Sequence, residues 1–551
     1  MIKLKAFRTS LLFLCLMEIF AGCQSSNFAS SARPQSAAGK VGEKTAAQSK
    51  ALETPSAIVK GSEINAILKN FMKTSKPYVF KPSSVEPQGR SKSFAKKISN
   101  SIDAVIYLDS DEKTVCYYAR GYTDSGKKIP APADSSGMFD GLKYLTEIDL
   151  SGFDFGNAVS MKDMFAGCVT LKSVDFTAFK TGRVTDMSGM FSKCKELTSL
   201  NLSAFDTSMV SSMKNMFYGC TKLSSLNLSS FSTGRVTDMS GMFYQCYELT
   251  ALDLSKFDTK NVTDMKEMFY FCEKLTSLNL AKFNTGKVTD MSGMFRGCRA
   301  IAYLDLSSFD TSHVTNMSLM FYECKKLESL NLYSFDTSNV TDMHHMFYNC
   351  FVLDLDLSSF NTGKVTDMNN MFNGCGLKHN TIDLSGFDTR NVTNMKEMFY
   401  WSKFRALDLS SFDTRNVTNM QRMFGSCLNL TSVKLSSFNT EKVSDMSYMF
   451  ICCLKLPSLD LSSFDTRNVT NMELMFEMDY DLDPQKSALA TIYASDKFVA
   501  KNIPAGKKIF NKCQKLKGGK GTAYSDSASN DASFARIDGG SSAPGYFTAK
   551  K

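Results

Sequence analysis

Residues 184–202 decide the fold; they read Val-Thr-Asp-Met-Ser-Gly-Met-Phe-Ser-Lys-Cys-Lys-Glu-Leu-Thr-Ser-Leu-Asn-Leu. Met187, Met190, Phe191 and Cys194 stand at i, i+3, i+4 and i+7. This spacing is typical of the apolar side of an amphipathic helix. We therefore predict a short helix of about two turns in this stretch.

The same pattern returns along most of the chain. A Met-Phe pair recurs with its Phe at positions 139, 165, 191, 217, 243, 269, 295, 321, 347, 372, 399, 424, 450 and 476. The first eight steps are 26 residues long, and the last five are 25, 27, 25, 26 and 26. Such a period predicts a solenoid, in which each unit buries its apolar residues against its neighbours.

The residue before the first Met of each unit is of the helix N-cap type. Its side-chain oxygen would accept a hydrogen bond from a free N–H at the helix start. The residues in this column are Ser160, Asp186, Ser212, Asp238, Asp264, Asp290, Asn316, Asp342, Asp367, Asn394, Asn419, Asp445 and Asn471. We expect capping and not a calcium ladder, because serine replaces the carboxylate twice.

Leu197, Leu200 and Leu202 follow in a Leu-x-x-Leu-x-Leu pattern, whose alternation predicts a half-buried strand. The Val-Thr-x stretch at 184–186 predicts a second, shorter extended segment. The predicted fold is an α/β solenoid, a leucine-rich-repeat-like stack of about 14 units of 26 residues. Each unit would contain one short parallel strand and one short helix, and caps would close the two ends.

Cysteines occupy one place in successive units, at the spacing of the apolar stripe. They are Cys168, Cys194, Cys220, Cys246, Cys272, Cys298, Cys324, Cys350, Cys375, Cys427 and Cys453, and Ser402 takes the place once. Side chains in register point the same way, so we predict a ladder of buried free thiols and not a disulfide framework. No paired Cys-x-x-Cys elements indicate a metal site.

The column between the last two strand leucines should point away from the core. It is mainly acidic, and the candidate partner-binding residues are Asp253, Asp305, Asp356, Asp383, Asp408 and Asp460. Two interpretations stay open: a solvated ladder that keeps the sheet soluble, or a polar recognition surface. Basic residues in the following turn could form one rim of such a surface; they include Arg183, Arg235, Lys260, Lys287, Lys364, Arg390, Arg415 and Arg467.

The ends of the chain lack the period. Residues 1–22 have the basic start and short apolar run of a signal peptide, and Ala-Gly-Cys at 21–23 resembles a lipoprotein box that would make Cys23 the lipid anchor. Residues 23–58, rich in Ser, Ala, Lys and Gln, predict a flexible tether. We expect an N-terminal cap over residues 59–135, the repeat solenoid over 136–480, and a C-terminal cap and tail over 481–551.

Composition argues against several classes of function. The net charge is only +9, which does not indicate nucleic-acid binding, and four histidines leave little for histidine-dependent catalysis or zinc. Gly-Gly-Lys-Gly-Thr at 518–522 lacks the spacing of a phosphate-binding loop. We see no polar cluster that departs from the period, so we expect no enzyme and no cofactor.

The unit Leu-x-x-Leu-Asp-Leu-Ser-Ser-Phe-Asp-Thr-x-Asn-Val-Thr-Asp/Asn-Met-x-x-Met-Phe-x-x-Cys resembles the 26-residue repeat of the BspA-like bacterial surface proteins, the DUF285 family. The match covers residues 137–480, and the flanks 60–65, 535–540 and 544–547 are also similar. The resemblance implies a membrane-anchored surface lipoprotein that adheres to host or extracellular-matrix proteins or to other microbes. The alternative is a structural envelope spacer, or a surface-layer component that associates with itself.

Overall fold

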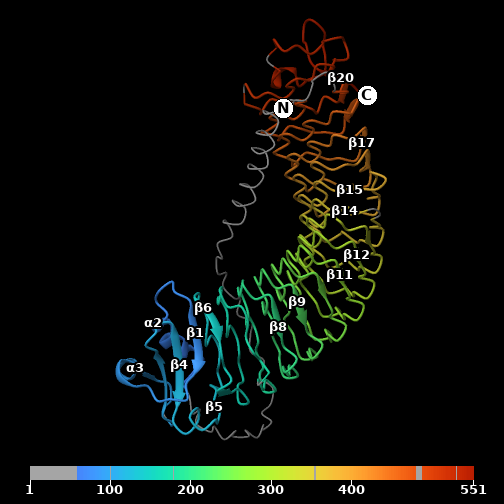
Figure 1. Ribbon diagram of the computed structural model, residues 1–551. Helices are drawn as coiled ribbons and strands as arrows, with labels where there is room; N and C mark the ends of the chain where they lie inside the picture. Colours follow the sequence, from blue (N-terminus) through green and yellow to red (C-terminus); the bar gives the residue numbers. More distant parts are fainter. Residues whose placement is uncertain are drawn as a thin grey trace, which may run out of the picture. The chain divides into compact units, whose positions relative to one another are not determined.

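The computed structural model describes residues 59–99, 101–177, 179–352, 355–478, 487–504, 506–528 and 530–550 (Figure 1). The predicted signal peptide, the predicted anchor Cys23 and the predicted tether lie outside these ranges. Among the helices of the described ranges, none has the length and apolar character needed to cross a membrane.

Regular elements are short in this chain. In the described ranges the helices are α2 (Gly61–Phe71), α3 (Gly89–Phe94) and the 3-10 helix η2 (Ala532–Phe534). The strands outside the central repeats are β1 (Tyr78–Pro82), β2 (Lys96–Lys97), β3 (Ala104–Leu108), β4 (Thr114–Ala119), β5 (Ile129–Pro130), β6 (Leu145–Ile148), β7 (Phe153–Asp154), β19 (Thr491–Ala494) and β20 (Phe547–Ala549). The strands of the repeats are β8 (Ser199–Asn201), β9 (Ser225–Asn227), β10 (Ala251–Leu252), β11 (Ser277–Leu278), β12 (Tyr303–Leu304), β13 (Ser329–Leu330), β14 (Phe351–Val352), β15 (Gly376–Leu377), β16 (Ala406–Asp408), β17 (Ser432–Lys434) and β18 (Ser458–Leu461).

A five-stranded sheet of order β2-β3-β4-β1-β6 precedes the central repeats. Strands β3 and β4 pair in antiparallel fashion and form a hairpin. Strand β1 pairs in parallel with β6 and places Phe80 beside Ile148, so the sheet continues into the repeats. Helix α2 packs Ile64 and Leu68 into the same core. These contacts cover apolar surface that the first repeat would otherwise expose.

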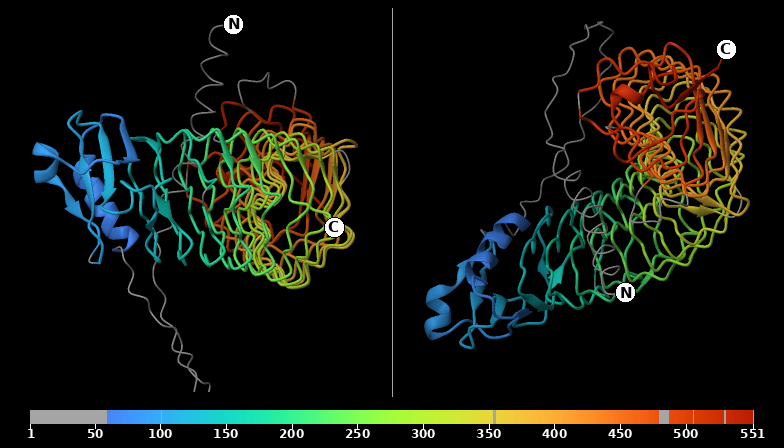
Figure 2. Two further views of the ribbon diagram at one scale, coloured as in Figure 1. Left: turned by 60° about the horizontal axis from the view of Figure 1, so that its bottom comes forward. Right: turned by 90° about the horizontal axis from the view of Figure 1, so that it is seen from above.

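Successive repeats, called rungs below, lie one on the next in parallel (Figures 1 and 2). Strands β8 and β9 align Leu200 with Leu226, and later strand pairs follow the same rule. A second column of single parallel bridges runs from Asp134 to Asn471 and joins the residue before the first Met of each rung to its equivalent in the next. The predicted solenoid and its predicted second extended segment are both confirmed.

The predicted helix is wrong, because residues 188–193 form consecutive turns. The N–H of Met190 donates to the carbonyl of Met187 three residues back, at 3.2 Å, and the N–H of Phe191 donates to Met216 of the next rung, at 2.9 Å. An α-helix would direct every N–H to the fourth residue back. Here every second N–H, from Met187, Gly189, Phe191 and Lys193, crosses to the neighbouring rung.

Left-handed backbone at two positions of each rung excludes the helix. The first column comprises Gly137, Asp163, Gly189, Asn215, Gly241, Glu267, Gly293, Leu319, His345, Asn370, Glu397, Arg422, Tyr448 and Leu474, all with φ between 53° and 62°. The second, four residues further on, comprises Gly141, Gly167, Lys193, Gly219, Gln245, Phe271, Gly297, Glu323, Asn349, Gly374, Trp401, Ser426 and Cys452. A right-handed helix cannot accommodate such a residue at every fourth position.

The predicted core columns are confirmed although the backbone differs. Met187, Met190, Phe191 and Cys194 are fully buried, as are their equivalents along the repeats. The Phe rings stack from rung to rung, for example at 5.6 Å between the ring centroids of Phe165 and Phe191. A repeat of four-residue turns therefore buries the same positions that a helix of 3.6 residues per turn would bury.

The predicted capping column caps a turn. The Oδ1 atom of Asp186 accepts a hydrogen bond from the backbone N–H of Ser188 at 2.8 Å. Asp238, Asp290 and Asn316 accept in the same way at 2.7–2.9 Å, and the shorter Ser160 accepts at 3.4 Å. The side-chain oxygen has the local role that the sequence predicts, in a turn of the kind that Asp and Asn favour.

The C-terminal segment continues the stack. Strand β19 pairs in parallel with β18, and β20 pairs in parallel with β19. Phe510 stacks on Phe476 with a centroid distance of 5.3 Å. The Gly-rich loop at 518–522 surrounds a carboxylate of the same chain: the N–H groups of Lys520 and Thr522 donate to Oδ2 of Asp538 at 2.8 and 3.0 Å. This loop therefore holds the end of the chain on the last rungs.

Candidate functional site

The predicted binding residues lie along the outer side of the strand column, which we call the strand face. Five of the six lie between two buried leucines, as Asp305 does between Leu304 and Leu306, and Asp383 lies between the half-buried Ile382 and the buried Leu384. Asp253, Asp305, Asp356, Asp383 and Asp408 are exposed, and Asp460 is half-buried. The alternation arises because successive side chains of a strand point to opposite sides.

A local hydrogen bond orients each of these carboxylates. Oδ1 of Asp305 accepts from the backbone N–H of Ser307, at 3.0 Å. Equivalent bonds of 2.9–3.1 Å hold Asp253, Asp356, Asp383, Asp408 and Asp460. Hydrogen bonds from Ser307 lower the pKa of Asp305, and those from Ser255 lower the pKa of Asp253. The strand face therefore keeps its negative charge into mildly acid solution.

Ion pairs divide the six residues into two groups. Lys434 binds Asp408 at 2.7 Å, and this hydrogen bond lowers the pKa of Asp408 to about 2. Lys550, next to the end of the chain, pairs with Asp460. No described basic residue forms an ion pair with the remaining four, Asp253, Asp305, Asp356 and Asp383.

The predicted basic rim is largely occupied by contacts within the repeats. Lys260 pairs with Asp258 of its own rung, and Arg415 pairs with Asp413, both at 2.8 Å. Nζ of Lys287 donates to Oδ1 of Asn261 in the preceding rung, also at 2.8 Å. These residues neutralise neighbouring carboxylates or join rungs, whereas four carboxylates of the strand face have no ion-pair partner within the described ranges.

The sequence reasoning missed two exposed tyrosines, Tyr303 on the strand face and Tyr333 in the turn beside it. Tyr303 is 66% exposed and Tyr333 is 65% exposed, and they belong to consecutive rungs. Serine or alanine occupies the place of Tyr303 in most other rungs, as at Ser277 and Ser329, and serine usually occupies the place of Tyr333, as at Ser307. The departure from the repeat was the signal that could have revealed them.

The sequence reasoning also missed a column of buried threonines. Oγ1 of Thr389 donates to the carbonyl of Asp413 in the next rung at 2.9 Å and accepts from the N–H of Asp413 at 2.8 Å. The same two bonds join Thr233 to Asp258. The hydroxyl thus bonds both backbone groups of one residue in the following rung, as a neighbouring strand would. We therefore assign this column a structural role.

An aromatic column follows the Met-Phe pair. The rings of Tyr218 and Tyr244 stack at 4.4 Å, and those of Tyr244 and Tyr270 stack at 4.1 Å. The guanidinium of Arg296 continues the column: it lies 5.0 Å from the ring centroid of Tyr270 and 4.4 Å from that of Tyr322. Because the ring faces contact one another, they are not available for stacking on a ligand.

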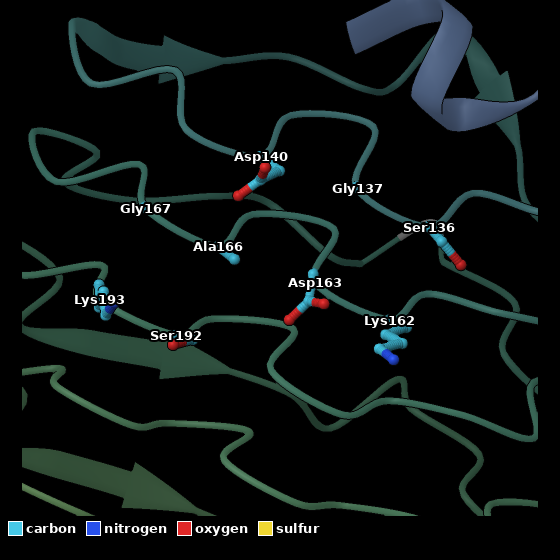
Figure 3. A pocket seen from close by; sticks show the side chains of 9 residues that line it. All are labelled: Ser136, Gly137, Asp140, Lys162, Asp163, Ala166, Gly167, Ser192 and Lys193. Atoms are coloured by element: carbon cyan, nitrogen blue, oxygen red, sulfur yellow. The ribbon is translucent and has the colours of Figure 1, made fainter. Parts of the chain in front are cut away.

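Smaller residues in the first rungs leave an open hollow beside this column (Figure 3). Ala166 and Ser192 line it where later rungs carry tyrosine, together with Lys162 and Lys193. Partial burial raises the pKa of Asp163, the carboxyl at its edge. None of the predicted site residues lies in the hollow, and its mixed charges define no reaction centre.

The predicted thiol ladder is confirmed, since the cysteines of the described residues are free and buried. Sγ of Cys298 donates to the carbonyl of Phe269 in the preceding rung at 3.2 Å. Burial raises the pKa of Cys298 to about 12, and that of Cys272 well above its ordinary value. These thiols remain protonated at neutral pH and are therefore poor nucleophiles.

Comparison with solved structures gives two similar chains. The functional domain of InlJ from Listeria monocytogenes, described as including a cysteine ladder, is 14% identical, covers 60% of this chain and has a TM-score of 0.30. The TLR13 chain of a TLR13–ssRNA13 complex is 17% identical, covers 66% of this chain and has a TM-score of 0.18. The chain spans 64% of the InlJ chain and 52% of the TLR13 chain, less than two thirds of either. The comparison with curated proteins gave no match.

Comparison with protein families gives one match, repeated along the rungs. The family is described as "Mycoplasma protein of unknown function, DUF285", and its model matches residues 133–251, 186–300, 264–382 and 376–489. Together these segments cover more than half of the 551 residues. They coincide with the column of parallel bridges that joins the rungs. The chain therefore belongs to the DUF285 family.

Proposed function

We propose that this protein is a lipid-anchored component of the bacterial cell surface that binds macromolecular partners through its strand face. The partners would be host or extracellular-matrix proteins, or the surfaces of other microbes. Cys23 would carry the lipid, and the segment from 24 to 58 would separate the anchor from the rungs. No catalytic step is part of the proposal.

The observation that carries the proposal is the row of oriented carboxylates on the strand face that form no ion pair with any described residue. Asp305, Asp356 and Asp383 are exposed, and backbone N–H groups fix their direction. Like charges in neighbouring rungs repel one another, as between Asp356 and Asp383, and this repulsion opposes the stabilising effect of the local hydrogen bonds. A partner that brings positive charge would relieve the repulsion, and several adjacent rungs would add their weak contributions.

Binding can be tested with beads that carry the full chain, mixed with intact mammalian cells, immobilised matrix proteins and other bacteria. We expect capture to fall when residues 264–315, two whole rungs, are removed, and to fall less when residues 186–237 are removed. Both deletions preserve the register because each joins Thr to Asp or Asn at equivalent positions. Equal capture by beads coated with albumin would contradict the proposal. Concentration-dependent light scattering by the chain alone would instead favour self-association.

The anchor is tested separately in the native host. Labelled palmitate should appear on the protein, globomycin should block its processing, and Cys23→Ala should abolish the label. Protease treatment of intact cells should then remove the rungs if they are displayed outside. Normal processing of the Cys23→Ala variant by an ordinary signal peptidase, with no palmitate on the wild type, would refute lipid anchoring.

A further inference from the structure

In a repeat protein, the other rungs show which residues the fold requires at each position. Serine or alanine at the places of Tyr303 and Tyr333 supports the same strand and the same turn elsewhere in the chain. The fold therefore does not need either aromatic ring. Two large departures in consecutive rungs, on one exposed face, indicate a requirement outside the fold.

The two tyrosines belong to consecutive rungs, Tyr303 in a strand and Tyr333 in the turn that follows the next strand. Tyr303 lies in β12 opposite Ser329 of β13, in parallel register. Tyr333 lies in the turn after β13, where its N–H donates to Oδ1 of Asn331 at 3.1 Å. Oη of Tyr303 donates to Oε2 of Glu328 at 2.9 Å, which limits the motion of the ring while leaving most of it exposed. Exposed tyrosines of limited freedom are typical of the residues that dominate protein interfaces.

The charged residues of the strand column near the tyrosines are negative. Asp305 shares a rung with Tyr303, and Asp356 follows one rung beyond Tyr333. Neither forms an ion pair with a described residue. The negative charge of Asp383 opposes the lowering of the pKa of Asp356, which records repulsion between neighbouring rungs. A ring face beside a carboxylate binds guanidinium and ammonium groups through cation–π and ion-pair attraction.

The spacing of the carboxylates matches one backbone conformation of a partner. Asp253, Asp305 and Asp356 lie two rungs apart, with Asn279 and Asn331 between them. Two rungs span about 9.6 Å at the strand spacing of a sheet. Three residues of a polyproline II segment span about 9.3 Å, and such segments bind to surfaces lined by aromatic residues.

We infer that Tyr303, Tyr333, Asp305 and Asp356 bind an extended segment of a partner protein that presents Arg or Lys at every third residue. This inference rests on the proposed function and names the chemistry of the partner. The basic side chains contact the carboxylates of alternate rungs, and the apolar residues between them pack on the tyrosine rings.

Fluorescence anisotropy at 0.15 M salt tests the inference with the full chain and a labelled (Arg-Pro-Pro)4 peptide. We expect saturable binding that weakens at least fivefold in Tyr303→Ser and in Tyr333→Ser, and at least twentyfold in the double variant. Both changes restore the residue found in other rungs, so the fold is preserved. Asp305→Asn should weaken binding and reduce its dependence on salt. Trp401→Ser removes an exposed aromatic ring outside the strand face and should change affinity less than twofold.

Two further peptides separate this chemistry from general attraction. (Glu-Pro-Pro)4 should not bind, and (Arg-Pro-Pro-Pro)3, which places Arg at every fourth residue, should bind at least fivefold more weakly. Unchanged binding in the double tyrosine variant, or equal binding of the two arginine peptides, would overturn the inference. If the wild type does not bind (Arg-Pro-Pro)4 but its beads still capture cells, the inference fails and the proposed function stands. If the wild type neither binds the peptide nor captures cells, matrix proteins or bacteria, both fail.

Discussion

The hydroxyl of Thr389 shows how much one buried residue can contribute to this fold. It satisfies both the N–H and the carbonyl of Asp413 in the next rung. Thr389→Val keeps the shape but leaves two buried polar groups unpaired, so we expect the free energy of unfolding to fall by about 2 kcal/mol. Thr389→Ser retains the oxygen and should cost less. Urea denaturation followed by circular dichroism measures the difference, and equal midpoints for Val and Ser would contradict the assigned role.

The carboxylate of Asp408 predicts how stability depends on pH. Its hydrogen bond from Lys434 lowers the pKa to about 2, below the ordinary value near 4. A carboxylate whose pKa is lower in the folded state stabilises the fold above pH 4 and loses this contribution as the pH falls toward 2. The thermal midpoint of Asp408→Asn should therefore approach that of the wild type between pH 4 and pH 2. A constant difference across this range would exclude the pair as its origin.

At the scale of the element, the turns of each rung depend on left-handed residues. Gly219 has a φ of 70°, and a Cβ there would meet no atom closer than 3.5 Å, so strain alone opposes substitution. Gly219→Ala should lower the free energy of unfolding by about 1 kcal/mol. Gln245 holds the same place in the next rung, so Gln245→Gly should be neutral or stabilising by up to about 1 kcal/mol, and Gln245→Ala provides the control. Urea midpoints of the three variants test whether glycine is more stabilising than alanine at this place; in a helix alanine would be the more stabilising residue.

The thiol column makes a chemical prediction. Burial raises the pKa of Cys246 and Cys272 well above the ordinary value, and both are fully buried. The ladder cysteines should therefore resist iodoacetamide at pH 8 in the native protein and react completely in urea. Mass spectrometry of the peptides identifies the labelled residues. Rapid labelling of these peptides without denaturant would mean that the rungs open or that the thiols face water.

The helix prediction failed for a reason specific to this element. Apolar residues at i, i+3, i+4 and i+7 identify one buried side. Both a helix and a series of left-handed turns can place these residues on one side. The glycines at 167, 189, 219 and 241 were the available signal, since they mark positions with positive φ. Whether an N–H bonds within its own segment or across to a neighbour depends on where the next rung lies, which one unit alone does not reveal.

At the scale of the whole molecule, the rungs act as interchangeable layers. Deleting residues 186–211 removes one whole rung and joins Thr185 to Ser212, so the bridge column continues. We expect this variant to fold with its stack shorter by about 4.8 Å, whereas deleting residues 186–198 removes half a rung and should unfold the neighbouring rungs. Small-angle X-ray scattering and hydrogen exchange measure both effects. Equal tolerance of the two deletions would refute stacking in register.

The candidate binding face was only partly predictable. The alternation of leucine and polar residues around Asp305 and Asp356 predicts that both carboxylates lie outside the core, and both are exposed. The ion pairs of this face were not predictable, because Lys550 reaches Asp460 from 90 residues away. Tyr303 and Tyr333 were not predicted because the search looked for residues that recur with the period, and these two depart from it.

The amino-acid sequence by itself determined the period, the stacking in register and the side of the chain that each column occupies. These follow from the hydrophobic pattern, because each unit of a solenoid buries its apolar residues against the neighbouring units. Only the tertiary structure decided that Met187 to Cys194 form turns and not a helix, that Thr389 completes the backbone bonding of its neighbour, and which carboxylates remain without an ion pair. Those outcomes depend on hydrogen bonds and charges between rungs, and such contacts exist only after one rung has packed on the next.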